Sequence, residues 1–89
     1  FITDINIVNP ATLVKDINKR LDINIPEDIG NTVGGVVAKL SQESGEKLES
    51  GKTFKVANAE ITILSMDNEL IRELKVIKTD EKDGIQYEI

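Results

Sequence analysis

A change in the spacing of apolar residues near Gly51 most limits the folds that this chain can adopt. Upstream, a segment that opens with Thr32-Val33-Gly34-Gly35 has apolar residues at helical spacing, with Thr32 as its N-cap. Downstream, apolar and polar residues alternate in short stretches, which is the period of half-buried strands. The downstream apolar positions are Phe54, Val56, Ile61, Ile63, Leu74 and Val76. This order predicts a helix followed by a three-stranded antiparallel meander.

The residues before Thr32 predict a strand, a helix and a loop. Ile5 and Ile7 alternate with polar residues, which indicates a half-buried strand within residues 1–8. Asn9 as N-cap and Pro10 as the first helical residue predict a helix over residues 9–21. Its expected apolar face consists of Leu13, Val14, Ile17 and Leu21. An acidic, proline-containing loop over residues 22–31 follows.

The second helix is expected to end near Leu40, and turn residues divide the meander. Residues 41–52 are polar and contain glycine, with Leu48 as one candidate for burial. Turns are predicted at residues 58–59 and 67–68. The expected apolar face of the second helix consists of Val36, Val37 and Leu40.

The middle and last strands of the meander depart from simple alternation. Leu64 and Met66 indicate that the middle strand becomes buried on both faces toward its end. In the last strand, Ile71 and Leu74 are out of phase. A β-bulge near residues 72–73 would return Leu74 to the face of Ile71.

The length of 89 residues predicts a single domain over residues 1–89 with a thin core. The expected class is α+β, with two helices packed on a small, mainly antiparallel sheet. Residues 79–84 predict a charged turn, and residues 85–89 alternate again, so 79–89 form either an extra edge strand or a tail. Because the sequence begins at Phe1, we expect it to be a trimmed piece of a longer protein, whose remainder could hold a membrane segment.

Composition excludes several classes of function. The chain has no cysteine and no histidine, which excludes disulfides, zinc–thiolate sites, cysteine nucleophiles and any triad that uses histidine as its base. Thr32 and Ser41 therefore lack a histidine to activate them. The net charge of −5 disfavours nucleic acid and anionic lipid surfaces as partners. No apolar run approaches the ~20 residues that span a bilayer, so direct membrane insertion is not expected.

The Gly-Lys-Thr run at residues 51–53, with Gly45 upstream, is similar to a phosphate-binding loop but fails its requirements. Five residues separate the two glycines where the motif has four. The residues that follow have the pattern of a strand, whereas the motif needs a helix whose amides hold the phosphates. Glu46 and Glu49 would also place negative charge against a phosphate.

Two further acidic patterns have a functional and a structural interpretation. Residues 79–84 are similar to the start of a calcium loop, but Thr79 occupies the first position, so a solvated turn is the preferred interpretation. Glu27 and Asp28 could act as a catalytic carboxylate pair of an enzyme fragment, or they could be solvated acids in a loop. We predict no catalytic, cofactor-binding or metal-binding residues, and no cofactor.

Gly34 and Gly35 need a specific explanation, because each glycine costs up to about 1 kcal/mol in a helix interior. One explanation is close approach of another backbone, with the helix start packed tightly against the sheet or a partner. The other is that the free amides of this helix start hold an anion or a nucleotide. Packing is the preferred interpretation, because the adjacent loop is acidic.

The order of these segments resembles the CorC/HlyC transporter-associated domain over about residues 6–78. The features that carry the resemblance are the strand–helix start, the acidic loop 25–28, the Thr-x-Gly-Gly run at 32–35, Gly51 and the aliphatic pattern at 71–76. The chain departs from the family at Asn9-Pro10, where a glycine is common, and in the extension 79–89.

The resemblance implies a compact α+β fold related to a portion of flavin-binding oxidoreductases, without transferring flavin binding. It implies a non-catalytic regulatory or assembly domain on the cytoplasmic side of the membrane, in a hemolysin-like or magnesium/cobalt efflux transporter. Its implied partners are the CBS-domain pair and membrane domain of the same parent chain. The exposed edges of the meander make a homodimer a further option. The alternative function is a small-ligand sensor that binds a nucleotide or anion at Gly34–Gly35.

Overall fold

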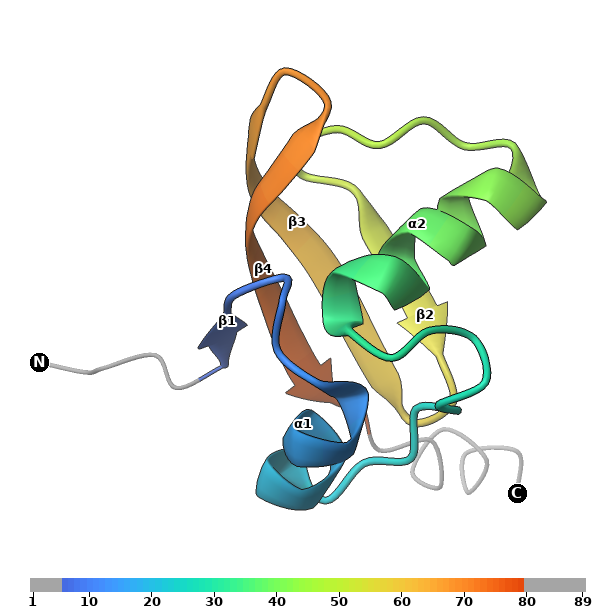
Figure 1. Cartoon of the computed structure of the whole chain (residues 1–89), viewed down its shortest axis with the longest axis vertical. Coiled ribbons are helices and arrows are strands. Elements are labelled where there is room, and N and C mark those ends of the chain that lie inside the picture. Colours follow the sequence, from blue (N-terminus) through green and yellow to red (C-terminus); the bar gives the residue numbers. More distant parts are fainter. Residues whose placement is uncertain (1–5, 80–89) are drawn as a thin grey trace, which may run out of the picture.

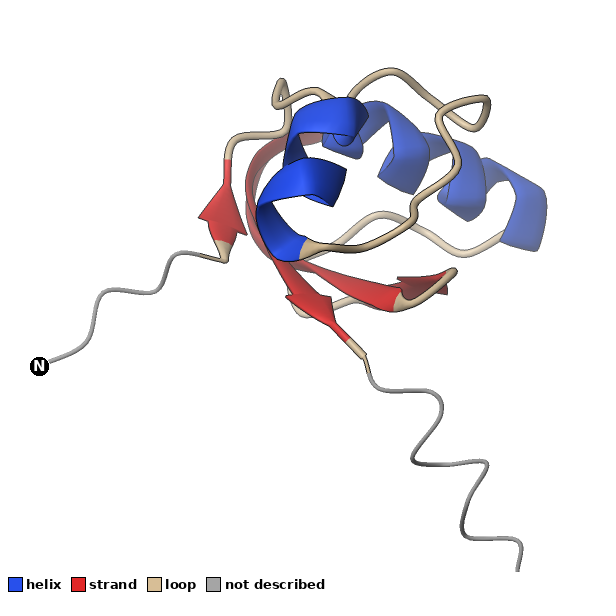
Figure 2. Ribbon diagram, turned by 90° about the horizontal axis from the view of Figure 1, so that it is seen from below, coloured by secondary structure: helices blue, strands red, loops and turns tan. Residues whose placement is uncertain are grey.

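The computed structural model of the chain describes residues 6–79 and contains two helices and a four-stranded sheet. Figures 1 and 2 show both helices on one face of the sheet, and no described helix covers the opposite face. The α+β class predicted from the sequence is therefore confirmed. The elements are β1 (Ile7–Val8), α1 (Val14–Leu21), α2 (Val33–Ser44), β2 (Thr53–Val56), β3 (Ala59–Asp67) and β4 (Leu70–Lys78).

All neighbouring strands are antiparallel, in the order β1-β4-β3-β2, which confirms the predicted meander and adds β1 beside its last strand. Both hairpin turns are displaced by one residue from their predicted positions. The β2–β3 turn is at residues 57–58, and the β3–β4 turn is at residues 68–69. Ala57 and Asn68 have φ angles of 53° and 60°, so the first turn residue is left-handed in each case.

The predicted bulge near residues 72–73 is confirmed, and a second bulge lies opposite it. In β4 the extra residue is Arg72, and in β3 it is Leu64. The two bulges compensate, so both strands resume the same register beyond them. The prediction that Leu64 is buried is wrong, because the β3 bulge leaves it 36% exposed, whereas Met66 packs partly against the core.

The core lies between the sheet and the two helices. Val8 is buried, whereas Ile7 is 43% exposed, so the predicted inward face of the first strand is wrong at Ile7. The reason is register: Val8 pairs with buried Leu74, and Ile7 pairs with Lys75 on the outer face. Ile5, residues 80–84 and residues 85–89 lie outside the described residues. The largest fully buried side chains are Ile17, Ile25, Ile61, Ile63, Leu74, Val14, Val33, Val36, Val37 and Val76.

Helix α1 begins at Val14, so the predicted start at Asn9 is wrong. Asn9 instead caps a turn, because its side-chain Oδ1 accepts a hydrogen bond from the Ala11 amide at 2.8 Å. Leu13 follows in an extended conformation as a bridge partner of Thr32, and its side chain is 41% exposed. Pairing with a distant segment thus keeps residues before Val14 out of the helix.

Helix α2 begins as predicted, and it ends later than predicted. Thr32 is its N-cap, and the Thr32 side chain accepts a hydrogen bond from the Gly35 amide at 3.0 Å. The helix continues to Ser44 and ends at Gly45, whose φ of 77° suits a residue without Cβ. The expected polar loop therefore starts four residues later, and Ser41 is buried within the helix.

Candidate functional site

The first turn of α2, residues 33–36, has no free backbone donor. A helix start normally leaves its first amides without partners, and this is the basis of anion binding there. Here all four amides donate hydrogen bonds within the chain. In order along the turn, the acceptors are Thr12 O at 2.9 Å, Pro10 O at 2.9 Å, Thr32 Oγ1 at 3.0 Å and Thr32 O at 3.0 Å. An anion at this turn would have to displace one of these bonds.

Steric contact explains Gly34, and it also explains Gly30 at the end of the preceding loop. A Cβ on Gly34 would lie 2.8 Å from the Pro10 Cβ, and a Cβ on Gly30 would lie 2.9 Å from backbone atoms of Gly35 and Val36. The predicted close approach of another backbone is therefore confirmed. The approaching segments are the turn before α1 and the end of the acidic loop, so the expectation of packing against the sheet is wrong.

The acidic loop over residues 22–31 is anchored by apolar and amide side chains, and its two acids are exposed. Ile25 is buried, and its backbone exchanges two hydrogen bonds of 3.0 Å with the Asn18 side chain. The amide of Asn24 donates to the Asn58 side chain at 2.8 Å. Glu27 and Asp28 are both exposed, and no ion pair within residues 6–79 includes either of them.

The Gly-Lys-Thr run at 51–53 forms the entry to β2. Gly51 has φ 91°, its amide donates to Ile63 O at 2.7 Å, and Lys52 O accepts from the Ile63 amide at 2.9 Å. Gly51 and Lys52 thus lie together opposite the single residue Ile63. This is a β-bulge of the type that requires glycine in its first position. The predicted strand after Thr53 is confirmed, and a phosphate loop is excluded because no helix follows.

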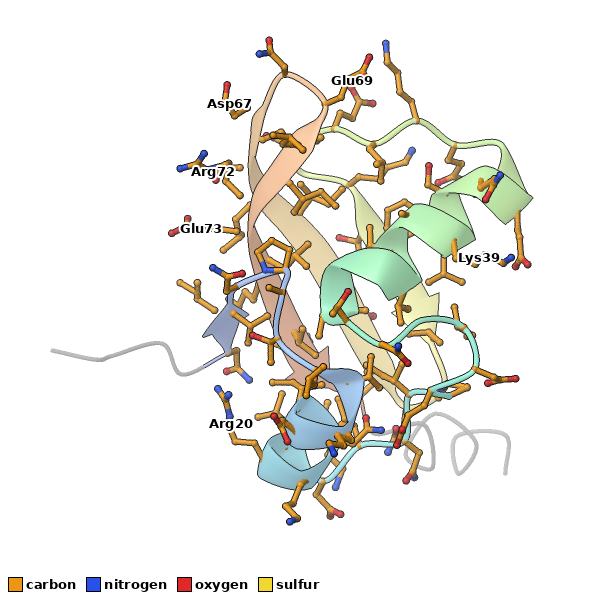
Figure 3. All side chains as sticks on the ribbon, viewed as in Figure 1. Arg20, Lys39, Asp67, Glu69, Arg72 and Glu73 are labelled. Carbon is orange, nitrogen blue, oxygen red and sulfur yellow. The ribbon has the colours of Figure 1, made fainter. Side chains whose placement is uncertain are left out.

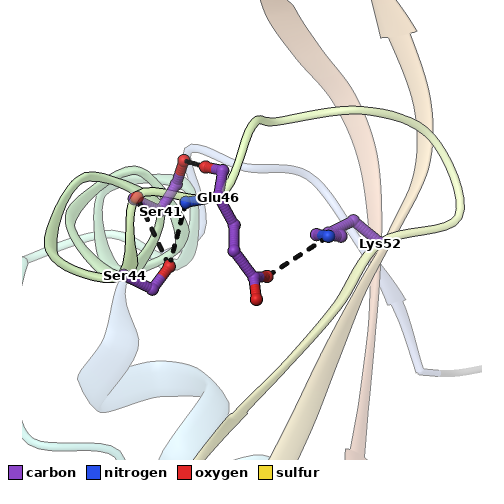
Figure 4. A network of polar contacts seen from close by, with 4 residues as sticks. All are labelled: Ser41, Ser44, Glu46 and Lys52. Carbon is purple, nitrogen blue, oxygen red and sulfur yellow. Dashed lines mark hydrogen bonds and ion pairs between the residues drawn. The ribbon is translucent and has the colours of Figure 1, made fainter.

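A small polar network joins the end of α2 to this bulge (Figure 4). The Ser41 hydroxyl donates to the Glu46 backbone carbonyl, and the Glu46 carboxylate lies 3.3 Å from the Lys52 ammonium. The Ser44 hydroxyl bonds to Ser41 O at 3.4 Å and accepts from the Glu46 amide at 3.3 Å. Ser41 and Lys52, which the sequence offered as chemical candidates, therefore hold the turn after α2.

A broad depression lies between α2 and the tip of the β3–β4 hairpin, and we call it the hairpin groove. It consists of two neighbouring hollows of about 500 and 400 Å³ that share Leu48 and Glu69. Gly34 and Gly35 line one end of it. Its apolar lining consists of Pro10, Ala11, Ala38, Leu48, Met66, Leu70 and Ile71.

The hairpin groove combines an exposed apolar residue with two charged lining residues, Lys47 and Glu69. Leu70 is 67% exposed, more than any other large apolar residue that the structure describes. Figure 3 shows Glu69 at the hairpin tip, with Asp67, Arg72 and Glu73 along the edge away from α2. An apolar hollow with a polar rim is the usual form of a protein-contact surface. Sequence reasoning did not identify Leu70 as exposed, because an apolar residue type does not by itself show whether the core covers the side chain.

Within residues 6–79, the structure offers neither a metal cluster nor a membrane-spanning helix. No group of three or more histidine, cysteine, aspartate or glutamate residues could hold a metal ion. Neither described helix is long and apolar enough to cross a membrane.

Comparison with known proteins gives one family over nearly all of the chain. Residues 4–80 match the profile of the transporter associated domain, CorC/HlyC. No curated protein sequence gives a significant match.

Several solved bacterial structures share the fold. One from Neisseria meningitidis, described as the CorC-associated region of a Mg²⁺ and Co²⁺ transporter, is 23% identical with TM-score 0.66, covering 82% of this chain and 86% of that chain. A transporter associated domain of a CBS domain protein from Porphyromonas gingivalis is 20% identical with TM-score 0.66, covering 83% and 87%. A hemolysin domain from Xylella fastidiosa, in complex with Mg²⁺ and Mn²⁺, is 16% identical with TM-score 0.64, covering 83% and 86%.

Proposed function

The chain belongs to the CorC/HlyC transporter associated domain family, and we propose that it is a non-catalytic regulatory or assembly domain of a membrane ion transporter. The parent protein is of the hemolysin-like or magnesium/cobalt efflux type, and the domain acts on the cytoplasmic side of the membrane. The similarity to domains of a CorC transporter region and of a CBS domain protein supports this assignment.

The hairpin groove is the observation that carries the proposal. Leu70 is part of the apolar lining and is 67% exposed to solvent. A partner that bound in the groove would remove most of this exposed surface from water. A fully buried leucine contributes about 1.5–3 kcal/mol relative to an exposed one. A contact of this strength that forms in one state of the transporter and not in another biases the equilibrium between them.

The proposed partners are the CBS-domain pair and the membrane domain of the same parent chain. The acidic surface, with a net charge of −5, fits a protein partner better than nucleic acid or anionic lipid. A homodimer is the competing partner assignment, and light scattering of the 89-residue chain over a range of concentrations distinguishes the two.

A binding experiment in trans tests the role of the hairpin groove. The 89-residue chain is titrated into the parent protein from which this domain has been deleted, with Leu70→Asp as the test variant. Leu64→Asp is the matched control, because Leu64 is exposed on the same hairpin but does not line the groove. Leu70→Asp is expected to weaken binding at least about tenfold, which corresponds to 1.4 kcal/mol.

The same pair of substitutions in the full-length protein tests function. Leu70→Asp is expected to change ion transport in membrane vesicles, and Leu64→Asp to leave it close to the unsubstituted level. Equal effects of the two variants would contradict the assignment to the groove. A parent protein without membrane helices would contradict the function itself.

The alternative function, a small-ligand sensor at Gly34–Gly35, has less support. The amides that would hold an anion already donate to Pro10 O and Thr32 Oγ1. Calorimetric titration of the 89-residue chain with nucleotides and flavins decides between the two. Binding at micromolar concentration that Gly34→Ala removes would favour the sensor over the assembly domain.

A further inference from the structure

One edge of the sheet is open along β2, which pairs only with β3 among residues 6–79. Val56 and Ala59 flank a two-residue turn and therefore form a hydrogen-bonded pair. Because such pairs alternate along an antiparallel ladder, the backbone groups of Thr53 and Lys55 point away from β3. This edge can therefore accept another strand.

A groove runs along this edge, and we call it the edge groove. It has a volume of about 240 Å³ and is lined by Leu40 and Ser44 of α2, by Glu46 and by residues 53–55 of β2. Figure 1 shows α2 crossing beside β2, so a strand added to β2 would lie under the helix. Leu40 and Phe54 provide an apolar floor for alternate side chains of such a strand.

The described part of the chain ends beside this edge. The Thr79 amide donates to Asn58 O at 2.9 Å, which holds Thr79 against the turn that ends β2. From the end of β4, a position outside β2 is three strand spacings away, or about 14 Å. The five residues 80–84 can span about 17 Å when extended, so they reach it.

We propose that residues 85–89 add to β2 as an antiparallel fifth strand and fill the edge groove. The sequence Ile85-Gln86-Tyr87-Glu88-Ile89 alternates apolar and polar residues, as a half-buried strand requires. In this strand the side chains of Ile85, Tyr87 and Ile89 would face the side of the sheet that carries Leu40 and Phe54. Glu88 would face the opposite, outer side together with Lys55. The proposal is independent of the proposed transporter function.

A second copy of the chain fits the edge less well. Two four-residue edges bury far less than the roughly 1,200 Å² of a stable interface. Each copy also carries a net charge of −5, so the copies repel each other. A tethered segment instead acts at an effective concentration of about 1 mM without a partner. It would also shield an edge that otherwise invites aggregation.

Amide hydrogen exchange of the 89-residue chain tests the proposal at the strand that receives the segment. The amides of Thr53 and Lys55 should exchange at least about tenfold more slowly than in a chain that ends at Thr79. The amides of Phe54 and Val56, which bond to β3, should stay protected in both and report that the shorter chain is folded. Equal exchange of the Thr53 and Lys55 amides in the two chains would overturn the proposal.

A matched pair of substitutions covers the case in which the shorter chain does not fold. Tyr87→Asp places a charge in the apolar groove and should abolish the protection of Thr53 and Lys55. Gln86→Asp places the same charge on the solvent face and should retain it. Equal effects of the two substitutions would refute the proposed alternation.

Tyrosine fluorescence gives an independent readout, because Tyr87 is the only tyrosine and the chain has no tryptophan. Acrylamide should quench Tyr87 in the chain at least about twofold less efficiently than in a free peptide of residues 80–89, because the docked ring is shielded. Protection of Thr53 that rises with protein concentration, together with a doubled mass in light scattering, would assign the edge to a second copy and overturn the proposal.

Discussion

Gly34→Ala is the substitution that most directly tests why α2 begins with two glycines. The added Cβ would lie 2.8 Å from the Pro10 Cβ and 3.0 Å from the Pro10 carbonyl oxygen. Ordinary contacts between carbon atoms are about 3.5–4.0 Å, so both are overlaps. Rotation of a side chain cannot relieve them, because the same carbonyl accepts the Gly34 amide at 2.9 Å.

Two effects of opposite sign determine the size of the change. Alanine in place of glycine raises helix propensity by up to about 1 kcal/mol. Forcing a methyl group into closed packing costs about 1–3 kcal/mol. Because Pro10 is rigid, we expect the cost at Gly34 to lie at the upper end of this range. We therefore expect Gly34→Ala to lower the free energy of unfolding by about 2 kcal/mol.

Urea denaturation followed by far-ultraviolet circular dichroism measures this loss. With a slope of about 1 kcal/mol per molar urea, the midpoint should fall by about 2 M at unchanged slope. Gly35→Ala is the control, because its Cβ would lie 3.1 Å from the Thr32 side-chain oxygen and no closer than 4.0 Å to Gly30 Cα. It should cost less than about 1 kcal/mol, the usual strength of an N-cap. A Gly34→Ala protein as stable as the unsubstituted chain would refute the packing explanation.

Three further substitutions test other contacts by the same urea measurement. Thr32→Ala should cost about 1 kcal/mol through loss of the α2 cap, whereas Thr32→Ser, which keeps the hydroxyl, should cost a few tenths; equal losses would exclude capping. Asn18→Ala should cost about 1–3 kcal/mol, because it leaves both backbone groups of Ile25 unpaired, and a neutral result would contradict this role. Ala57→Gly should stabilise by about 0.5–1 kcal/mol, because Ala57 has φ 53°, and a loss of stability would contradict strain at that turn.

Local sequence patterns predicted the elements whose causes are local. The Thr32 cap, the alternation in β2 and the bulge at Arg72 depend on neighbouring residues, and all three are confirmed. The glycine pair also predicted a close backbone approach, which is confirmed at Gly34, although the sequence did not identify Pro10 as the neighbour.

The errors occur where a distant segment decides the outcome. Asn9 has the side chain of an N-cap, but backbone pairing of residues 12–14 with residues 31–33 delays α1 to Val14. Ile7 is as apolar as Val8, and only the register against β4 directs Val8 inward. No local pattern contains this register, because it depends on how two separate strands align.

The same distinction between local and long-range causes applies to the candidate site. The sequence alone determined that the chain has no histidine or cysteine for chemistry, and that Thr32 caps a helix whose second and third residues are glycines. Only the tertiary structure decided that the amides of that turn are occupied and that Leu70 is left exposed beside a groove. The physical reason is that a residue's type fixes which bonds it can form, whereas long-range packing fixes which of those bonds are already made.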